Sequence, residues 1–188
     1  MTTATATPTA APRTAEPIAH TIYDSPIGPL LLAATATGLV RLAYAEGDTE
    51  ALLEELSARV SPRLVDVPAR LDPVRRELDE YFTARRTQFD SPLDWALIGP
   101  FARRVLEATA RIEYGETATY GELVGGAARA AGNALARNPI AIVIPCHRVV
   151  QSSGALGGYG GGMERKRFLL ELEGALPSGP SRARRSAH

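Results

Sequence analysis

The chain has 188 residues, of which 45% are hydrophobic and 22% are charged, and its 21 Lys and Arg residues balance its 21 Asp and Glu residues. This composition is typical of one or two globular domains and argues against a disordered or fibrous protein. A single cysteine excludes an internal disulfide, and three scattered histidines disfavour a structural metal site. The sequence therefore predicts no metal site.

The two ends of the chain are poor in apolar residues. Residues 1–19 are rich in Thr, Ala and Pro and lack the apolar core of a secretory signal or a membrane span. We expect them to form a disordered tail, with a transit peptide as a minor alternative, and we expect a second disordered tail over residues 177–188. The absence of an apolar run long enough for a bilayer predicts a soluble, cytoplasmic protein without membrane contact.

Charge is unevenly divided along the chain. Residues 1–100 hold nine Arg against fourteen Asp and Glu, whereas residues 101–188 hold eleven Arg and one Lys against seven Glu. An acidic half joined to a basic half favours contact of the second half with a polyanion. A merely solvated surface would have the same composition, so both interpretations stay open.

The first half predicts an α/β domain over residues 20–95. Apolar runs at residues 30–34 and 39–44 flank a Gly-bearing connection, which indicates a β-hairpin. Leucines at helical spacing predict a helix over residues 48–60, and Asp72-Pro73 opens a second helix whose apolar face holds Val74, Leu78, Tyr81 and Phe82. A small sheet with helices follows from these elements.

The second half, residues 96–176, is predicted to be mostly helical. Phe101, Val105, Leu106 and Ile112 form the apolar face of a helix over residues 101–112. Further on, two short helices around Gly125-Gly126 have the layout of a helix-turn-helix, and the second is built from Ala and Gly around Arg129. Close helix packing inside a core explains the same small residues, so the pattern alone leaves both readings open.

The only cysteine, Cys146, follows the apolar run Ile140 to Ile144, which we interpret as a strand that Pro145 ends. His147 and Arg148 come next, so a nucleophile, a general base and a cation are consecutive. A buried structural cysteine is the alternative. Adjacent residues on a strand point to opposite faces, so contact between the thiol and the imidazole would need a bend or a bridging water.

Several motifs together resemble one family, the O6-alkylguanine-DNA alkyltransferases. They are Asn138-Pro139-Ile140, Ile144-Pro145-Cys146-His147-Arg148, and the glycine-rich segment from Gly154 to Gly162 with Tyr159, preceded by Tyr114-Gly115-Glu116-Thr117 and Tyr120-Gly121-Glu122-Leu123. The resemblance covers about residues 24–176. It implies a two-domain α+β protein: an N-terminal domain with a small β-sheet and helices, and a mostly helical, winged-helix-like C-terminal domain with a helix-turn-helix.

The resemblance also implies the chemistry. Cys146 would accept the alkyl group from O6-alkylguanine in duplex DNA and keep it as a thioether, which limits each molecule to one turnover. His147 would take the thiol proton through a water and Glu173 would orient the imidazole, as in a catalytic triad. Asn138 would tie the active-site turn together, and the Tyr120 hydroxyl would hydrogen-bond to the purine. No cofactor is implied.

The expected DNA partner is bound by a monomer through the minor groove, with the target base flipped out of the duplex. Arg129 matches the side chain that takes the place of the flipped nucleotide, on a helix that begins near Ala128. Val149, Tyr159 and Gly160 match residues that line the guanine pocket, and Ser152 and Gly160 match residues that touch the DNA backbone.

Two departures from the family pattern bear on function. The stretch between Tyr120 and Arg129 is several residues short, which changes how the helix-turn-helix can dock. Leu106 and Ala102 stand where bacterial members usually have Trp and often have Gln. Two alternatives therefore accompany the repair function: a protein that binds the lesion without repairing it, and a Cys-His hydrolase, which would need an oxyanion hole.

Overall fold

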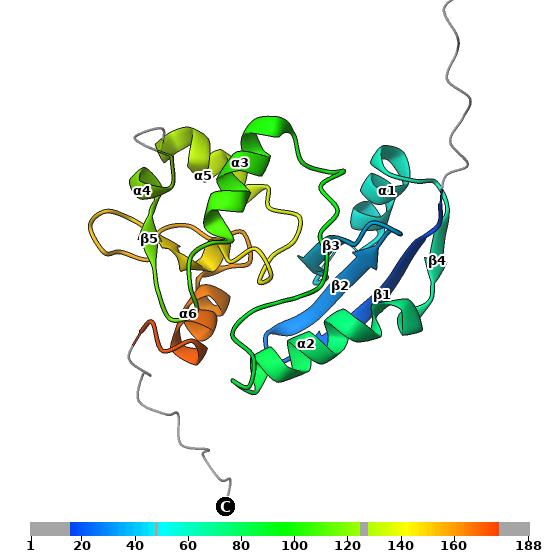
Figure 1. Ribbon diagram of the computed structural model, residues 1–188, viewed down its shortest axis with the longest axis horizontal. Helices are drawn as coiled ribbons and strands as arrows, with labels where there is room; N and C mark the ends of the chain where they lie inside the picture. Colours follow the sequence, from blue (N-terminus) through cyan, green and yellow to red (C-terminus); the bar gives the residue numbers. More distant parts are fainter. Residues whose placement is uncertain (1–15, 48, 125–127, 177–188) are drawn as a thin grey trace, which may run out of the picture.

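The computed structural model describes residues 16–47, 49–124 and 128–176. The first half contains β1 (Ile18–Ser25), β2 (Gly28–Ala34), β3 (Leu39–Tyr44), α1 (Thr49–Arg59), β4 (Leu64–Asp66), the 3-10 helix η1 (Pro68–Leu71) and α2 (Asp72–Phe82). The second half contains α3 (Pro100–Thr109), β5 (Ala118–Thr119), α4 (Tyr120–Val124), α5 (Ala128–Ala136), the 3-10 helix η2 (Cys146–Arg148), β6 (Val149–Val150) and α6 (Met163–Leu172). Figure 1 shows the sheet and its helices on one side of the molecule and the helical half on the other. This is the two-domain α+β architecture that the sequence predicts.

The first half is built around a four-stranded sheet of order β3-β2-β1-β4. β1 pairs with β2 and β2 with β3 in antiparallel register, so the predicted hairpin between residues 30 and 44 is confirmed. β4 returns parallel to β1 after the crossover through α1. β1 begins at Ile18, inside the segment predicted to be a tail, because Ile18 and Ala19 are fully buried against the sheet's neighbours.

Both faces of this sheet are covered, as the alternation of side chains requires. Ala33 and Val40 pack with Leu56 of α1 on one face. Leu32 and Leu42 point to the other face, where they join a cluster that includes α2 and the helical half. The predicted apolar side of α2 is buried at Val74, Leu78 and Tyr81.

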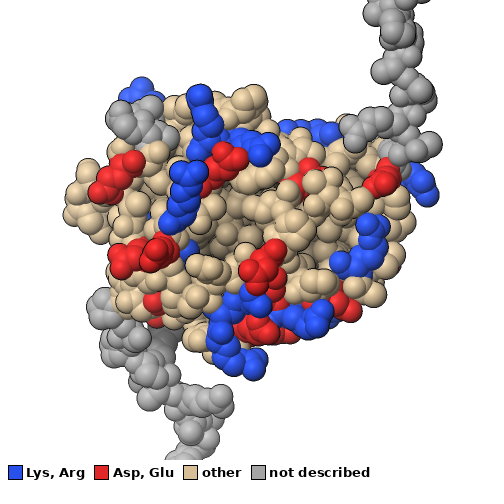
Figure 2. Space-filling view, viewed as in Figure 1, with Lys and Arg blue, Asp and Glu red and all other residues tan. Residues whose placement is uncertain are grey.

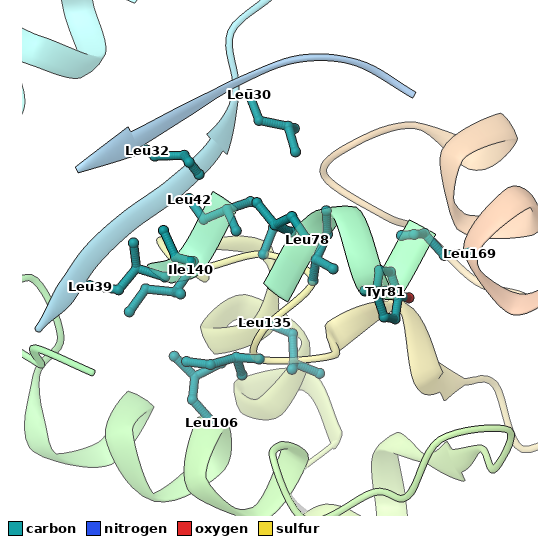
Figure 3. Packing of buried hydrophobic residues seen from close by; sticks show 14 of the residues in the cluster. Leu30, Leu32, Leu39, Leu42, Leu78, Tyr81, Leu106, Leu135, Ile140 and Leu169 are labelled. Carbon is teal, nitrogen blue, oxygen red and sulfur yellow. The ribbon is translucent and has the colours of Figure 1, made fainter. Parts of the chain in front are cut away.

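One large core joins the two halves of the chain. Figure 3 shows that side chains from the sheet, from α2 and from the helical half meet in one cluster, represented by Leu30, Leu32, Leu39, Leu42, Leu78, Tyr81, Leu106, Leu135, Ile140 and Leu169. Leu106 is 1% exposed and packs there. Phe101 was expected in the core but is 43% exposed, since it sits in the first turn of α3 beyond the helix's buried side.

The predicted pair of short helices is present as α4 and α5, which pack together. Gly132 of α5 lies beside the Tyr120 ring, where an added Cβ would be 3.8 Å from Cε1, an ordinary van der Waals contact. This contact between the two helices therefore does not require a glycine. Gly125 and Gly126, where the sequence predicts the shortened turn, lie outside the described residues.

The segment before Cys146 is a compact turn rather than the expected strand. Ile144 N donates to Ile140 O at 3.0 Å, and Ile142 has a φ of +70°, a left-handed conformation that β-branched residues rarely adopt. The turn docks on the open edge of β3: Leu42 N donates to Pro139 O at 2.8 Å and Ala141 N to Leu42 O at 2.9 Å. The outer edge of the N-terminal sheet thus fixes the segment that leads to the cysteine.

Charged side chains are mixed on the face seen in Figure 2, where cations and carboxylates alternate over α3 and along α2. Many of them are paired within one helix or with a near neighbour, such as Arg103 with Glu107 at 2.8 Å and Arg86 with Glu80 at 2.7 Å. The charge imbalance between the two halves therefore does not create a separate acidic side and basic side on this face. Among the described helices, none is long and apolar enough to cross a membrane.

Candidate active site around Cys146

Cys146 opens the short helix η2 and is partly buried. Asn138, two residues after α5, holds the preceding turn: its Oδ1 accepts from Ile140 N at 3.0 Å and its Nδ2 donates to Ile144 O at 2.9 Å. The same Nδ2 lies 3.2 Å from Cys146 Sγ. Because Oδ1 is used by a backbone donor, the amide orientation is fixed and an N–H faces the sulfur. The structure thus brings together the predicted residues Asn138 and Cys146.

Burial raises the pKa of the Cys146 thiol, while the hydrogen bond from Asn138 and the positive charge of Lys166 act in the opposite direction. The resting sulfur is therefore a thiol at neutral pH. A buried thiol of this kind becomes a good nucleophile only when a base removes its proton as it reacts.

His147 and Glu173 form a buried pair behind the cysteine. His147 Nε2 lies 2.8 Å from Glu173 Oε1, and both side chains are fully enclosed. Burial lowers the pKa of His147, and the charges of Arg148 and Lys166 lower it further, so the imidazole is neutral at pH 7. An ionised Glu173 can only accept, so Nε2 carries the hydrogen and the lone pair is on Nδ1. That buried Nδ1 has no hydrogen-bond partner among the described residues.

Glu173 is held by more partners than the sequence indicated. Arg148 donates to it twice, from Nε to Oε2 at 2.8 Å and from Nη2 to Oε1 at 3.0 Å. Tyr81, from α2 of the N-terminal half, donates its hydroxyl to Oε1 at 2.5 Å. Burial opposes ionisation, but the hydrogen bonds from His147 and Arg148 dominate and lower the pKa of Glu173 to about 2. The carboxylate is therefore charged at all physiological pH values.

Lys166, the only lysine of the sequence, is fully buried on α6. Its Nζ donates to Val149 O at 2.6 Å and to Leu156 O, which ties the strand after the cysteine to the glycine-rich loop, residues 154–162. Burial lowers the pKa of Lys166 to about 8, and the nearby sulfur raises it. Lys166 thus places a positive charge near Cys146 without a carboxylate partner of its own in the described contacts.

The other predicted pocket residues surround this centre. Val149 is buried in β6, and Tyr159 is partly buried in the glycine-rich loop; the loop also carries the exposed Gly160. Tyr120, at the start of α4, reaches Gly158 O at 3.5 Å with its hydroxyl. Burial raises the pKa of Tyr120, and the nearby Cys146 raises it further, which places both side chains in one neighbourhood.

The residues predicted to touch DNA lie further out. Arg129 and Ala128 are exposed in the first turn of α5, and Ser152 is exposed just after β6. None of the described hydrogen bonds or ion pairs joins these residues to the Cys146 centre. They are available to an external partner.

Sequence reasoning missed Tyr81 and Lys166 as parts of the site. Lys166 could have been noticed as a lone lysine among twenty arginines, whereas Tyr81 comes from the other half of the chain and carries no local motif. Within the described residues, no group of His, Cys, Asp and Glu side chains could hold a metal ion.

A thiol in front of a buried His–Glu pair is the arrangement of a cysteine-dependent enzyme, and the exposed Arg129 on the neighbouring short helices suits a nucleic-acid partner. Comparison with known proteins gives the particular family. Residues 18–95 match 6-O-methylguanine DNA methyltransferase, ribonuclease-like domain, and residues 100–175 match 6-O-methylguanine DNA methyltransferase, DNA binding domain. The chain belongs to this family.

Proteins of known name are similar to this chain over most of its length and most of theirs. The methylated-DNA–protein-cysteine methyltransferase of Mycobacterium leprae is 47% identical over 156 residues, which cover 80% of this chain and 88% of the relative. The protein of the same name from Methanosarcina acetivorans is 40% identical over 83% of this chain and 98% of the relative. The crystal structure of Mycobacterium tuberculosis OGT in complex with DNA matches with a TM-score of 0.71 and 40% identity, over 85% of this chain and 93% of that one. The chain is thus a DNA-repair methyltransferase that transfers alkyl groups from DNA to a cysteine, and Cys146 is the only cysteine in its sequence.

Proposed function

We propose that the substrate is O6-alkylguanine in duplex DNA and that Cys146 Sγ attacks the alkyl carbon in a direct displacement. The observation that carries this proposal is the pairing of a sulfur that faces Asn138 Nδ2 at 3.2 Å with a buried neutral imidazole whose Nδ1 is free to accept a proton. The new bond is Sγ–C and the bond that breaks is C–O6. The guanine leaves with the electron pair of that bond and takes up one proton, which His147 returns through water, so the proton lost by the thiol ends on the guanine.

The proton of the thiol moves to His147 Nδ1. No direct contact between Cys146 and His147 is present among the described hydrogen bonds, so a water between Sγ and Nδ1 is the path that we propose. Glu173 stabilises the imidazolium that forms, because its carboxylate stays charged and accepts from Nε2. Asn138 donates to the sulfur and stabilises the thiolate that forms when the proton leaves.

The product is a thioether, and water does not displace its alkyl group because the thioether has no good leaving group. The sequence offers no second cysteine to remove the alkyl group. Each molecule therefore acts once, and repair is stoichiometric.

Base flipping follows from the position of the thiol. A partly buried sulfur cannot reach O6 inside a stacked duplex, so the guanine enters the pocket formed by Val149, Tyr159 and Gly160, where the Tyr120 hydroxyl hydrogen-bonds to the purine. Arg129, exposed at the start of α5, fills the space that the base leaves. Ala128 allows this helix to approach the minor groove closely, and Ser152 and Gly160 contact the backbone. We propose that one monomer does this in the cytoplasm.

Mass spectrometry after incubation with a duplex that contains one O6-methylguanine tests the proposal. We expect a gain of one methyl group on the peptide that contains Cys146, at one equivalent per protein, and no gain for Cys146→Ser, which should still bind the lesion. An unmodified duplex is the control for binding, and sedimentation of the protein with and without DNA tests the monomer.

Three other results of this experiment would contradict the proposed function or the assigned acceptor. Tight binding of the lesion without a mass gain would identify a lesion-binding protein. Release of product over many turnovers with an unmodified protein would identify a hydrolase. A methyl group on the protein that survives Cys146→Ser would refute the assignment of the acceptor.

A further inference from the structure

The N-terminal sheet contributes a tyrosine to the surroundings of the thiol. Tyr44 is the last residue of β3, and its hydroxyl lies 2.8 Å from the hydroxyl of Tyr159 in the glycine-rich loop. The two rings meet edge to face, with centroids 6.2 Å apart and an angle of 77°. This hydrogen bond spans 115 positions of sequence and joins the two domains at the loop that forms the pocket.

Tyr44 is itself held firmly. The Arg165 guanidinium lies over its ring, 4.5 Å from the centroid, and Arg165 is fixed by Ile27 O at 2.7 Å, Gly161 O at 3.0 Å and the carboxylate of Glu46 at 2.5 Å. Gly161 lies against the Tyr44 ring, so close that a Cβ added to this glycine would be 2.2 Å from Tyr44 Cε2. The loop therefore closes on the Tyr44 ring, and only a glycine fits at this contact.

Both tyrosines lie near the reactive sulfur. Burial raises the pKa of Tyr44 to about 12, with the charge of Cys146 among the further causes. Burial also raises the pKa of Tyr159, and the charge of Cys146 is the next largest cause. Both tyrosines therefore lie within range of the charge on the sulfur, and one of them belongs to the other domain.

We propose that Tyr44 is a positioning residue: its hydroxyl holds Tyr159 in the orientation that the alkyl-transfer site needs, so that the N-terminal domain sets the conformation of the glycine-rich loop. Tyr44 acts through Tyr159, which rests on the proposed assignment of Tyr159 to the guanine pocket.

The test is single-turnover methyl transfer from a duplex with O6-methylguanine, with DNA binding measured separately by anisotropy. Tyr44→Phe keeps the ring, the Arg165 stacking and the Gly161 contact but removes the hydroxyl. We expect transfer at saturating DNA to be about threefold to tenfold slower, the effect of one lost hydrogen bond, with unchanged DNA affinity. Tyr23→Phe is the matched control, because it removes another tyrosine hydroxyl of the same sheet, bonded at 2.7 Å to Asp79 Oδ1. Its transfer rate should equal that of the wild type.

A double-mutant cycle shows whether the hydroxyl pair acts as one unit. If it does, Tyr44→Phe combined with Tyr159→Phe is no slower than Tyr159→Phe alone. Losses that multiply, a weakened DNA affinity with normal transfer, or a Tyr44→Phe variant as fast as the wild type would each overturn the proposal. Failure of the wild-type protein to accept a methyl group would instead refute the proposed function, so the two failures are distinguishable.

Discussion

Replacement of Glu173 by Gln should remove a specific pH dependence of stability. In the folded protein the pKa of Glu173 is about 2, against an ordinary value of 4.5. Between these values the unfolded chain binds a proton that the folded protein does not, so the stabilisation is complete above pH 4.5 and is lost as the pH falls toward 2. At about 1.4 kcal/mol per pKa unit, the contribution is about 3 kcal/mol in total, of which about 2 kcal/mol is lost by pH 3.

The assay is urea unfolding of the wild type and of Glu173→Gln at pH 6 and pH 3. Because Gln does not titrate, the difference in free energy of unfolding between the two proteins should shrink by about 2 kcal/mol over this range. Glu164→Gln is the matched control for the Glu-to-Gln change: Glu164 is exposed in the first turn of α6 and takes part in none of the described hydrogen bonds or ion pairs, so the shrinking difference should be confined to Glu173→Gln.

A difference between wild type and Glu173→Gln that is the same at both pH values would refute the reasoning. The variant leaves Arg148 inside the protein without its carboxylate, which costs about 3–5 kcal/mol at neutral pH in comparable buried pairs. If it does not fold, ¹³C NMR titration of the Glu173 carboxylate in the wild type gives the same answer, and a midpoint near 4.5 would contradict the structure.

Four further predictions concern catalysis and the action on duplex DNA. Burial lowers the pKa of His147, so the rate of methyl transfer should be constant from about pH 6.5 to 8 and fall only at lower pH; a tenfold rise per pH unit across this range would instead show that free thiolate is the reacting species. In Tyr81→Phe, Glu173 loses one donor and its charge acts more strongly on His147, so the acid limb of the same profile should move to higher pH; an unmoved limb would show that Tyr81 only packs. Asn138→Ala should slow transfer by about tenfold to a hundredfold. Asn138→Asp keeps the oxygen that accepts from Ile140 N but loses the Nδ2 donor, so it should be similarly slow. A normal rate in Asn138→Asp would show that the Nδ2 donor has no part in the mechanism. Arg129→Ala should reduce transfer from duplex DNA at least tenfold more than transfer from single-stranded DNA, because only a duplex has a stacked position to fill; equal losses on both substrates would contradict that role.

The helices and strands whose apolar residues recur at a regular spacing could be predicted from the sequence. The hairpin of β2 and β3 and the helix α2 follow from alternation and from apolar residues at helical spacing, which reflect a single buried face. The run from Ile140 to Ile144 could not be assigned in this way, since a short apolar segment is buried equally well as a strand or as a turn. Its turn is determined by Asn138 and by the edge of β3, which are tertiary partners.

The residues of the site also divide into those that the sequence indicates and those that depend on tertiary packing. Cys146 and His147 are adjacent in sequence, and the family motifs indicated Asn138 and Glu173, so these four could be named before the structure. Tyr81 was predicted correctly as a core residue of α2, but its buried hydroxyl bond to Glu173 depends on how the two domains pack. The spacing of apolar residues predicts which side of a helix is buried. It does not predict which polar atom the end of a buried side chain will contact.

The pairing of residues 139–141 with the outer edge of β3 has a consequence for folding. An unpaired edge strand invites association with other chains. Residues 92–94 cover this edge at Leu39, and the segment that leads to the nucleophile covers it at Leu42. The event that completes the protection of the sheet from aggregation is therefore also the event that places the sulfur. A nascent or partly unfolded chain has both an open edge and an unformed thiol centre, so a cysteine that can be used only once is placed for reaction only in molecules that have finished folding.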